Sequence, residues 1–225
     1  MNYGFDQDSE LVLTKNDEPF RHQIQLYEHV IESLALENRK LLEVGSGRGG
    51  GIDYLGRTKP LAALLGVDIS EKAIEQCQQD YNNHKLVFTQ GSADSLPIDS
   101  NSIDIVINVE SSHCYPDIKA FLSEVHRVLV ADGALALCDV RTPESMNKLE
   151  NLFYECGFSV EKEQTITAQV ISALEKMSND RLKIADEMPG LLKRAFTDFA
   201  GIQSSTAYDM MKNNKLVYKS FILKK

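Results

Sequence analysis

The sequence predicts an α/β fold, in which an open, mostly parallel sheet of seven strands carries helices on both faces and ends in an antiparallel strand. Two observations support this prediction. Between residues 38 and 140, short apolar runs alternate with segments of helical periodicity, and continuous apolar strands are typical of a parallel sheet buried on both faces. Near the end of the chain, two further strand-like segments flank a mainly helical stretch, a pattern that often completes an open α/β sheet.

The first five strands are predicted from short apolar runs that are bounded by polar residues or glycine. They lie at residues 40–44, 64–68, 85–89, 103–109 and 134–140. Ser70 is a favourable helix N-cap, and the helix that it starts is expected to end near Tyr81. A second amphipathic helix is expected from Asp117 to Val130, ended by the turn at residues 131–133.

A single domain is expected over residues 1–225. After the fifth strand, a helix over residues 143–156 ends at Gly157, a strand begins at Phe158, and Leu216 to Leu223 alternates as a last strand. The expected parts are an N-terminal helical cap at 1–37, a ligand-binding core at 38–140, and a C-terminal part at 141–225 with a helical lid insertion at about 168–212.

Composition excludes several classes of function. The net charge of −9 and the pI near 5.1 disfavour binding to nucleic acid or to an anionic membrane surface. No apolar run approaches the roughly 18 residues of a membrane helix, so no integral membrane segment is expected. The first ten residues have no apolar run, which argues against a signal peptide. The four cysteines are widely spaced, which indicates neither a zinc site nor a disulfide framework. We therefore expect reduced thiols and a cytoplasmic protein.

The strongest motif is EVGSGRGGG at residues 43–51, where a strand turns into a helix that is expected to reach Leu55. Glycines permit positive φ and let a ligand approach the backbone, and the free N–H groups of the helix attract negative charge. Gly45, Ser46 and Gly47 are the expected contacts. The same run also satisfies the dinucleotide fingerprint, so the turn alone fits either NAD or S-adenosylmethionine.

A carboxylate at the end of the second strand strengthens the cofactor assignment. Asp68 follows Gly47 by 21 residues, at the place where an acid accepts hydrogen bonds from ribose hydroxyls. The same position occurs in NAD enzymes, and an acid there can also simply precede a helix.

Three further features favour S-adenosylmethionine over NAD. Glu43 lies where it can reach the ammonium of a methionine moiety, whereas it would repel a pyrophosphate. In the loop after the third strand, Ser92, Ala93 and Asp94 offer an N–H and acceptors to an adenine edge. A helical segment also precedes the first strand, whereas dinucleotide folds usually open with the strand.

The segments EVGSGRGGG, GVDIS, GSADSLP and ESSHCYPDIKAFLSEVHRVLVADG resemble the class I S-adenosylmethionine-dependent methyltransferases that act on small molecules and lipids. GRGGG, ESSHCYP and the tail at 201–225 most resemble the phthiotriol/phenolphthiotriol dimycocerosate methyltransferase group, which O-methylates lipid polyketide hydroxyls. The run VADG at 130–133 departs from the Lys/Arg-Pro-Gly-Gly that is usual in the family, and affects a surface turn.

This resemblance implies a Rossmann-like fold, S-adenosylmethionine as cofactor and S-adenosylhomocysteine as product. It also implies that the cofactor is lined by Glu43, Gly45, Gly47, Asp68, Ile69, Ser92, Ala93, Asn108 and Val109.

The catalytic candidates follow the fourth strand, because ligands of open α/β sheets bind beyond the carboxyl ends of the strands. His113 can remove a proton from an acceptor hydroxyl, which contributes about 10²–10⁴-fold to a rate. Glu110 can orient His113 or contact the cofactor. Two alternatives stay open: His113 as a loop residue bonded to backbone, and Glu110 as a packing or capping carboxylate. No residue pair has metal-ligand spacing, and a metal is not expected.

Recognition of the acceptor is expected from the N-terminal helix and the insertion. The candidate apolar wall residues, each of which could instead belong to the core, are Tyr27, Met177, Met188, Phe196, Phe199, Met210 and Met211. The predicted function is methyl transfer to a small hydrophobic, lipid-like or polyketide-like acceptor, at a hydroxyl oxygen in the first instance. The alternatives are N- or C-methylation, an NAD-dependent oxidoreductase, and a non-catalytic cofactor-binding protein. The sequence does not indicate an oligomeric state.

Overall fold

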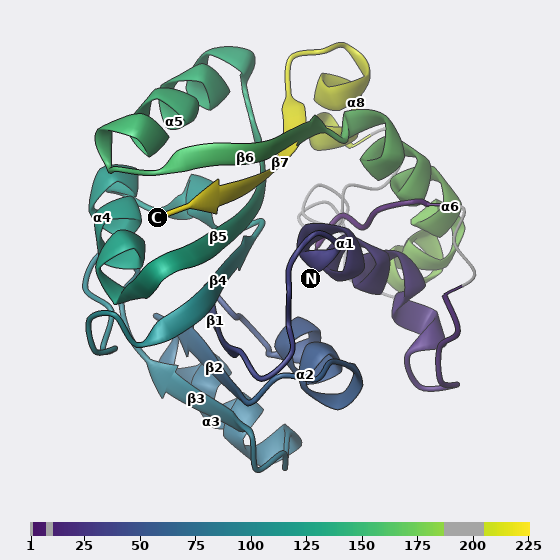
Figure 1. The fold of residues 1–225 in the computed structure, drawn as a ribbon. Coiled ribbons are helices and arrows are strands. Elements are labelled where there is room, and N and C mark those ends of the chain that lie inside the picture. Colours follow the sequence, from purple (N-terminus) through teal and green to yellow (C-terminus); the bar gives the residue numbers. More distant parts are fainter. Residues whose placement is uncertain (1, 8–10, 187–204) are drawn as a thin grey trace.

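The computed structural model describes residues 2–7, 11–186 and 205–225. Its centre is one seven-stranded sheet in the order β3-β2-β1-β4-β5-β7-β6, drawn in Figure 1. The strands are β1 (Lys40–Val44), β2 (Ala63–Asp68), β3 (Leu86–Gln90), β4 (Ile103–Val109), β5 (Leu129–Arg141), β6 (Ser159–Thr165) and β7 (Val217–Lys224).

Strand directions confirm the predicted fold class. The strands β1 to β5 pair in parallel, and β7 runs antiparallel to both β5 and β6. Because β1 lies between β2 and β4 and runs parallel to both, the carboxyl ends of the three strands lie side by side. Glu43 therefore pairs with Gly66 on one side and Ile107 on the other, which brings the predicted cofactor residues of three strands to one edge.

Helices cover both faces of the sheet (Figure 1). One buried cluster joins the sheet to α1 (Arg21–Ile31), α2 (Gly50–Thr58), α3 (Glu71–Asp80), α6 (Thr167–Asp186) and α8 (Thr206–Lys212). On the other face, a second buried cluster joins it to α4 (Ile118–Val128) and α5 (Pro143–Glu155). The described part of the chain also contains two 3₁₀ helices, η1 (Glu18–Phe20) and η2 (Ser112–Cys114).

Side-chain caps fix where helices begin. Ser70, the predicted cap, accepts a hydrogen bond from the Ala73 N–H at 3.3 Å. Asp117 caps α4 through the Ala120 N–H at 2.9 Å, and Thr142 caps α5 through the Ser145 N–H at 3.2 Å. Each cap satisfies a helix N–H that would otherwise lack a partner.

The predicted boundary between α4 and β5 is wrong. The helix ends at Val128 and not at Val130, and β5 begins at once with Leu129, which is fully buried and pairs with Ile103. The turn that was expected to end the helix is instead a kink within β5, where Asp132 has φ +61°. Burial of Leu129 against the sheet thus prevails over the local turn signal.

Within the expected helical cap at 1–37, the described helices are η1 (Glu18–Phe20) and α1. The N-terminal segment at residues 2–7 is not helical. It is extended between α1 and α6: the Phe5 N–H donates to the His22 carbonyl at 2.9 Å and the Asp6 N–H to the Gln169 carbonyl at 3.1 Å. Phe5 stacks on His29 with ring centroids 4.4 Å apart. No helix among the described residues is long and apolar enough to cross a membrane.

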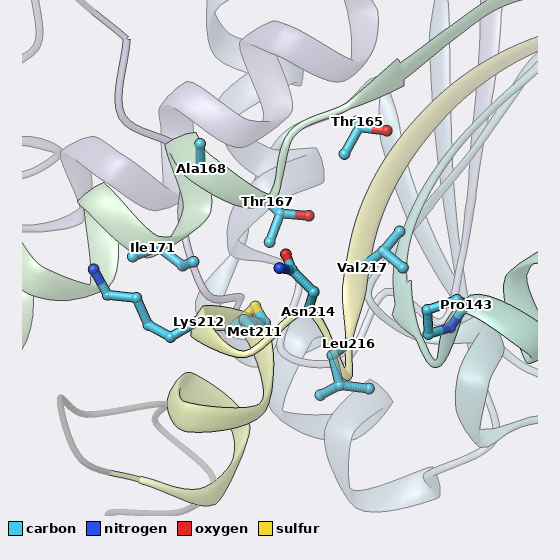
Figure 2. A pocket seen from close by; sticks show the side chains of 10 residues that line it. All are labelled: Pro143, Thr165, Thr167, Ala168, Ile171, Met211, Lys212, Asn214, Leu216 and Val217. Atoms are coloured by element: carbon cyan, nitrogen blue, oxygen red, sulfur yellow. The ribbon is translucent and has the colours of Figure 1, made fainter.

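A groove of about 410 Å³ opens where the helical insertion meets the end of the sheet (Figure 2). Its walls come from the start of α5, the end of β6, α6, α8 and the start of β7. The lining residues are Pro143, Thr165, Thr167, Ala168, Ile171, Met211, Lys212, Asn214, Leu216 and Val217. Its volume lies within the range of small-molecule sites.

Candidate active site

The glycine-rich turn exposes backbone where a ligand would approach. Gly45, Gly47 and Gly49 all have positive φ, at +76°, +52° and +73°. A Cβ at Gly47 would have no heavy atom within 4 Å, whereas one at Gly45 would lie 2.4 Å from Ser111 Oγ. Gly45 and Ser46 anchor the turn by donating their N–H groups to the Val67 carbonyl at 2.8 and 3.1 Å. Open space therefore lies beside Gly47.

Glu43 presents a buried carboxylate oxygen without a partner. The residue is 1% exposed, and its Oε1 accepts the Tyr27 hydroxyl at 2.5 Å. Its Oε2 has no hydrogen-bond partner among the described residues. Burial raises the pKa of Glu43 to about 8. Because an unpaired buried carboxylate is costly, this arrangement fits a cationic group such as an ammonium.

Two more unpartnered polar atoms lie at the same edge of the sheet. Within the described chain, Ser46 Oγ and Asn108 Oδ1 are buried without a hydrogen bond. Asn108 lies near the end of β4, and its amide nitrogen donates to the Val44 carbonyl at 2.9 Å and to Ser111 Oγ at 2.8 Å. Since buried polar atoms are normally paired, this group fits a polar ligand above β1 and β4.

Asp68 connects the glycine-rich turn to the next helix. Its Oδ2 accepts the Gly47 N–H at 2.8 Å and its Oδ1 the Ser70 N–H at 2.9 Å. The side chain is half-buried, so both oxygens keep acceptor capacity towards solvent. Ile69, beside it, is 70% exposed and offers an apolar face of the kind that a flat base can cover.

The loop after β3 joins this group through a backbone bond, from the Gly91 N–H to the Asp68 carbonyl at 3.0 Å. Ser92 Oγ donates to Asp94 Oδ1 at 2.5 Å, and Ala93 packs against the core. Val109, also predicted to line the cofactor, has its side chain in the buried apolar cluster.

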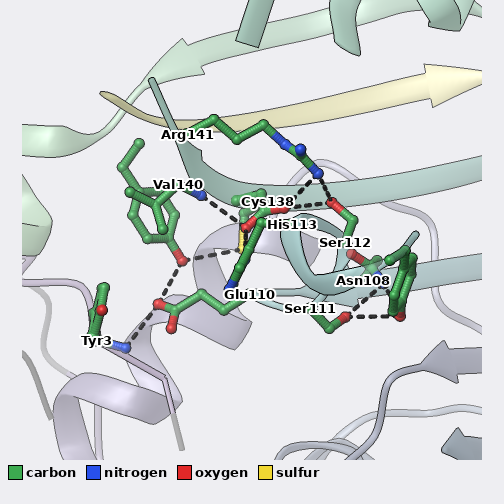
Figure 3. A network of polar contacts seen from close by, with 12 residues as sticks. Tyr3, Asn108, Glu110, Ser111, Ser112, His113, Cys138, Val140 and Arg141 are labelled. Atoms are coloured by element: carbon green, nitrogen blue, oxygen red, sulfur yellow. Dashed lines mark hydrogen bonds and ion pairs between the residues drawn. The ribbon is translucent and has the colours of Figure 1, made fainter. Parts of the chain in front are cut away.

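A polar network lies at the ends of β4 and β5 (Figure 3). His113 Nδ1 lies 2.6 Å from Oδ1 of Asp139, a fully buried residue. Because a carboxylate only accepts, Nδ1 carries a proton, and in the neutral imidazole Nε2 is left as an acceptor. The hydrogen bond to Asp139 raises the pKa of His113 above its usual value. His113 is thus an imidazole oriented by a carboxylate.

Three residues of this network were missed by the sequence reasoning: Ser112, Asp139 and Arg141. Oδ2 of Asp139 accepts hydrogen bonds from Ser112 Oγ and from the Arg141 guanidinium, the latter at 3.2 Å. One signal was present. Asp139 is an acid near the carboxyl end of an apolar strand, where ligands of such sheets bind.

Glu110 does not bind His113. It has φ +49°, and its Oε1 accepts the Tyr3 N–H at 2.8 Å and the Tyr218 hydroxyl at 2.7 Å. Burial raises its pKa to about 7. Glu110 therefore ties the N-terminal segment and β7 to the end of β4, and Asp139 orients His113.

The residues predicted to form apolar walls around the acceptor lie in different parts of the structure. Met211 is buried and lines the groove, and Met210 is half-buried on the same helix. Met177 accepts the Gln23 amide at 3.3 Å. Tyr27 belongs to the cofactor side, where it binds Glu43 and its ring fills the space above Gly51. The remaining three candidates, Met188, Phe196 and Phe199, lie outside the described residues.

Known proteins match this chain over most of its length. Residues 42–137 match the family described as a methyltransferase domain. A phthiotriol/phenolphthiotriol dimycocerosates methyltransferase of Mycobacterium leprae is 32% identical over 98% of this chain and 83% of its own. A fatty-acid O-methyltransferase of Mycolicibacterium smegmatis is 32% identical over 98% of this chain and 81% of its own.

Solved structures show the same fold at lower identity. Geranyl diphosphate C-methyltransferase from Streptomyces coelicolor aligns with a TM-score of 0.73 and 12% identity, over 100% of this chain and 91% of its own. The [4+2]-cyclase SpnF aligns with a TM-score of 0.74 and 18% identity, over 100% and 87%. The sequence relatives therefore identify the family: the chain belongs to the class I S-adenosylmethionine-dependent methyltransferases, in the group of the phthiotriol/phenolphthiotriol dimycocerosates methyltransferases.

Proposed function

We propose that this enzyme transfers a methyl group to a hydroxyl oxygen of an apolar, lipid-like acceptor, with His113 as the general base. The observation that carries the proposal is the bond between His113 and buried Asp139. Two curated relatives, named for phthiotriol dimycocerosates and for fatty acids, support the acceptor class. Four free cysteines support a reducing, cytoplasmic location.

Residues of the chain would hold S-adenosylmethionine at the edge formed by β1, β2 and β4. Glu43 would bind the ammonium, and the backbone from Gly45 to Gly47 would lie against the methionine moiety. Asp68 would accept hydrogen bonds from the ribose hydroxyls. Ile69 and the loop at 92–94 would flank the adenine, with Asn108 beneath the site. When bound, this cofactor supplies an electrophilic methyl group on a sulfonium.

The base favours oxygen as the methylated atom. A hydroxyl becomes a better nucleophile as its proton leaves, and Nε2 of His113 is the free acceptor of the imidazole. Asp139 would stabilise the imidazolium that forms, since its carboxylate already holds Nδ1. A carbon acceptor has no hydroxyl proton for His113 to remove. No contact among the described residues favours a reaction other than O-methylation.

The apolar part of the acceptor would occupy the groove of Figure 2. The groove lies at the part of the sheet that also carries Arg141, because its wall residue Val217 pairs in the sheet with Arg141, whose guanidinium binds Asp139. Ile171 and Leu216 give it apolar surface, which would favour binding of an acyl chain. The helices α6 and α8 would then act as the predicted lid insertion.

Filling the groove is expected to weaken binding of long acceptors only. Ala168 is exposed at the groove wall, so Ala168→Trp should occupy space without disturbing the core. We expect KM for a long-chain alcohol acceptor to rise at least tenfold, with kcat and cofactor affinity unchanged and a short-chain acceptor unaffected. Ala62→Trp, at an exposed alanine just before β2, is the matched control. An equal effect on short and long acceptors would contradict the groove assignment.

The cofactor assignment is tested by Asp68→Ala. Loss of the carboxylate that would bind the ribose should weaken S-adenosylmethionine at least tenfold in calorimetry, because charge-assisted hydrogen bonds contribute about 1.5–3 kcal/mol each. Asp104→Ala is the matched control, since Asp104 also accepts a backbone N–H, that of Lys40 at 2.9 Å, at the start of β1. Unchanged affinity in Asp68→Ala would overturn the assignment.

Labelled methyl transfer into a lipid extract would identify the acceptor.

A further inference from the structure

Arg141 is a charged residue placed beside the proposed base, with a side chain only 11% exposed. Its Nη2 donates to Ser112 Oγ at 2.9 Å and to Asp139 Oδ2 at 3.2 Å. Figure 3 shows the guanidinium of Arg141 beside Ser112. Its Nε is buried without a hydrogen-bond partner in the described part of the chain. A guanidinium kept for stability alone normally has its donors satisfied, because an unpaired buried donor is costly. This placement therefore indicates a functional role.

The two oxygens of Asp139 face different donors. Oδ1 accepts from the Val140 N–H at 2.9 Å and lies against His113 Nδ1. Oδ2 accepts from Ser112 and from Arg141. Because each oxygen has two donors, the carboxylate cannot rotate without losing hydrogen bonds. When the imidazole is neutral, Arg141 is the cation among these four donors, and its charge stabilises the carboxylate from the Oδ2 side.

We propose that Arg141 is a positioning residue for the methyl transfer proposed above, on which this inference rests. By fixing Oδ2 of Asp139, Arg141 keeps Oδ1 against His113 and holds the imidazole in the tautomer with Nδ1 protonated. Nε2 then stays free to accept a proton from the acceptor. Without Arg141, Oδ2 keeps Ser112 alone, so the carboxylate can turn and its Oδ1 no longer stays against Nδ1. The neutral imidazole then populates both tautomers. The Nε2-protonated form has no acceptor at Nε2 and cannot serve as the base.

The test measures the tautomer and the kinetics separately. In ¹⁵N NMR of the full chain, neutral His113 of the wild type should show a single tautomer, protonated at Nδ1. Arg141→Met should show a mixture of the two, with kcat at least tenfold lower and with KM for the acceptor and affinity for S-adenosylmethionine within about twofold. Arg39→Met is the matched control, since Arg39 also binds an aspartate, Asp104, at 2.9 Å. This pair lies at the amino ends of β1 and β4.

An unchanged His113 tautomer in Arg141→Met would overturn this proposal, whatever happens to kcat. If kcat is lower while the tautomer is unchanged, the result would indicate direct contact between Arg141 and the acceptor. Should Arg141→Met not fold, Arg141→Gln keeps a polar side chain at the buried position and carries the same expectations. A tautomer change without turnover of any acceptor would count against the proposed function, while the control of the His113 tautomer by Arg141 would still stand.

Discussion

Replacing Glu43 by glutamine is expected to weaken binding of S-adenosylmethionine at least 100-fold. The buried carboxylate has one oxygen on the Tyr27 hydroxyl and, among the described residues, no partner for the other. An ammonium that binds there gains a charge-assisted contact in a water-poor site. The neutral amide introduced by Glu43→Gln would lose this attraction, and its NH2 group would face the cation. Calorimetry of the two proteins measures the difference.

The same substitution is expected to change how stability depends on pH. Burial raises the pKa of Glu43 to about 8 from an ordinary 4.5, so between these values the folded protein keeps a proton that the unfolded chain has lost. Stability of the free enzyme should therefore fall as pH rises through this window. Glu110, with a pKa raised to about 7, acts in the same direction. In Glu43→Gln the fall should be smaller, as measured by urea unfolding from about pH 5 to 9.

A matched control exists on the same side of the sheet. Glu28 accepts the Tyr54 hydroxyl at 2.5 Å, as Glu43 accepts that of Tyr27, but Glu28 is also paired with Lys59 at 2.7 Å. Glu28→Gln should therefore leave cofactor affinity unchanged. Equal affinities of the wild type and Glu43→Gln would remove Glu43 from the cofactor site.

The cofactor half of the site could be predicted from sequence because its signals are local. Glu43 and the glycines lie within the run at residues 43–51, and Asp68 ends the next strand. In a parallel sheet, the carboxyl ends of neighbouring strands meet at one edge, so strand prediction alone brings these residues together. The fold class was also predictable from local signals, because each apolar run in the sequence forms one strand.

The catalytic half was only partly predictable. His113 is visible in the loop after β4, but its partner lies 26 residues away on β5. Glu110 is nearer in sequence and was expected to orient His113 or to contact the cofactor, yet its position at φ +49° directs it to Tyr3 and Tyr218. Which of two acids reaches the imidazole depends on backbone geometry and strand register, which a single sequence does not encode locally.

Loss of the Asp139 carboxylate is expected to have the second large effect, on turnover. In Asp139→Asn, the neutral amide can no longer hold the Nδ1-protonated tautomer by charge, and the imidazolium that forms on proton transfer is no longer stabilised. We expect kcat to fall by about 10²–10⁴-fold, the range attributed to general-base catalysis, with affinity for S-adenosylmethionine unchanged. Asp117→Asn, at the exposed N-cap of α4, is the matched control and should retain full turnover.

A double-variant cycle decides whether His113 and Asp139 act as one unit. His113→Ala alone should lower kcat about as much as Asp139→Asn, because the carboxylate acts only through the imidazole. The double variant His113→Ala/Asp139→Asn should then be no slower than His113→Ala, since residues that act together give non-additive losses. Losses that multiply in the double variant would mean that the two residues act separately. In that case Asp139 would contact the acceptor itself, and the assignment of His113 as the oriented base would be wrong.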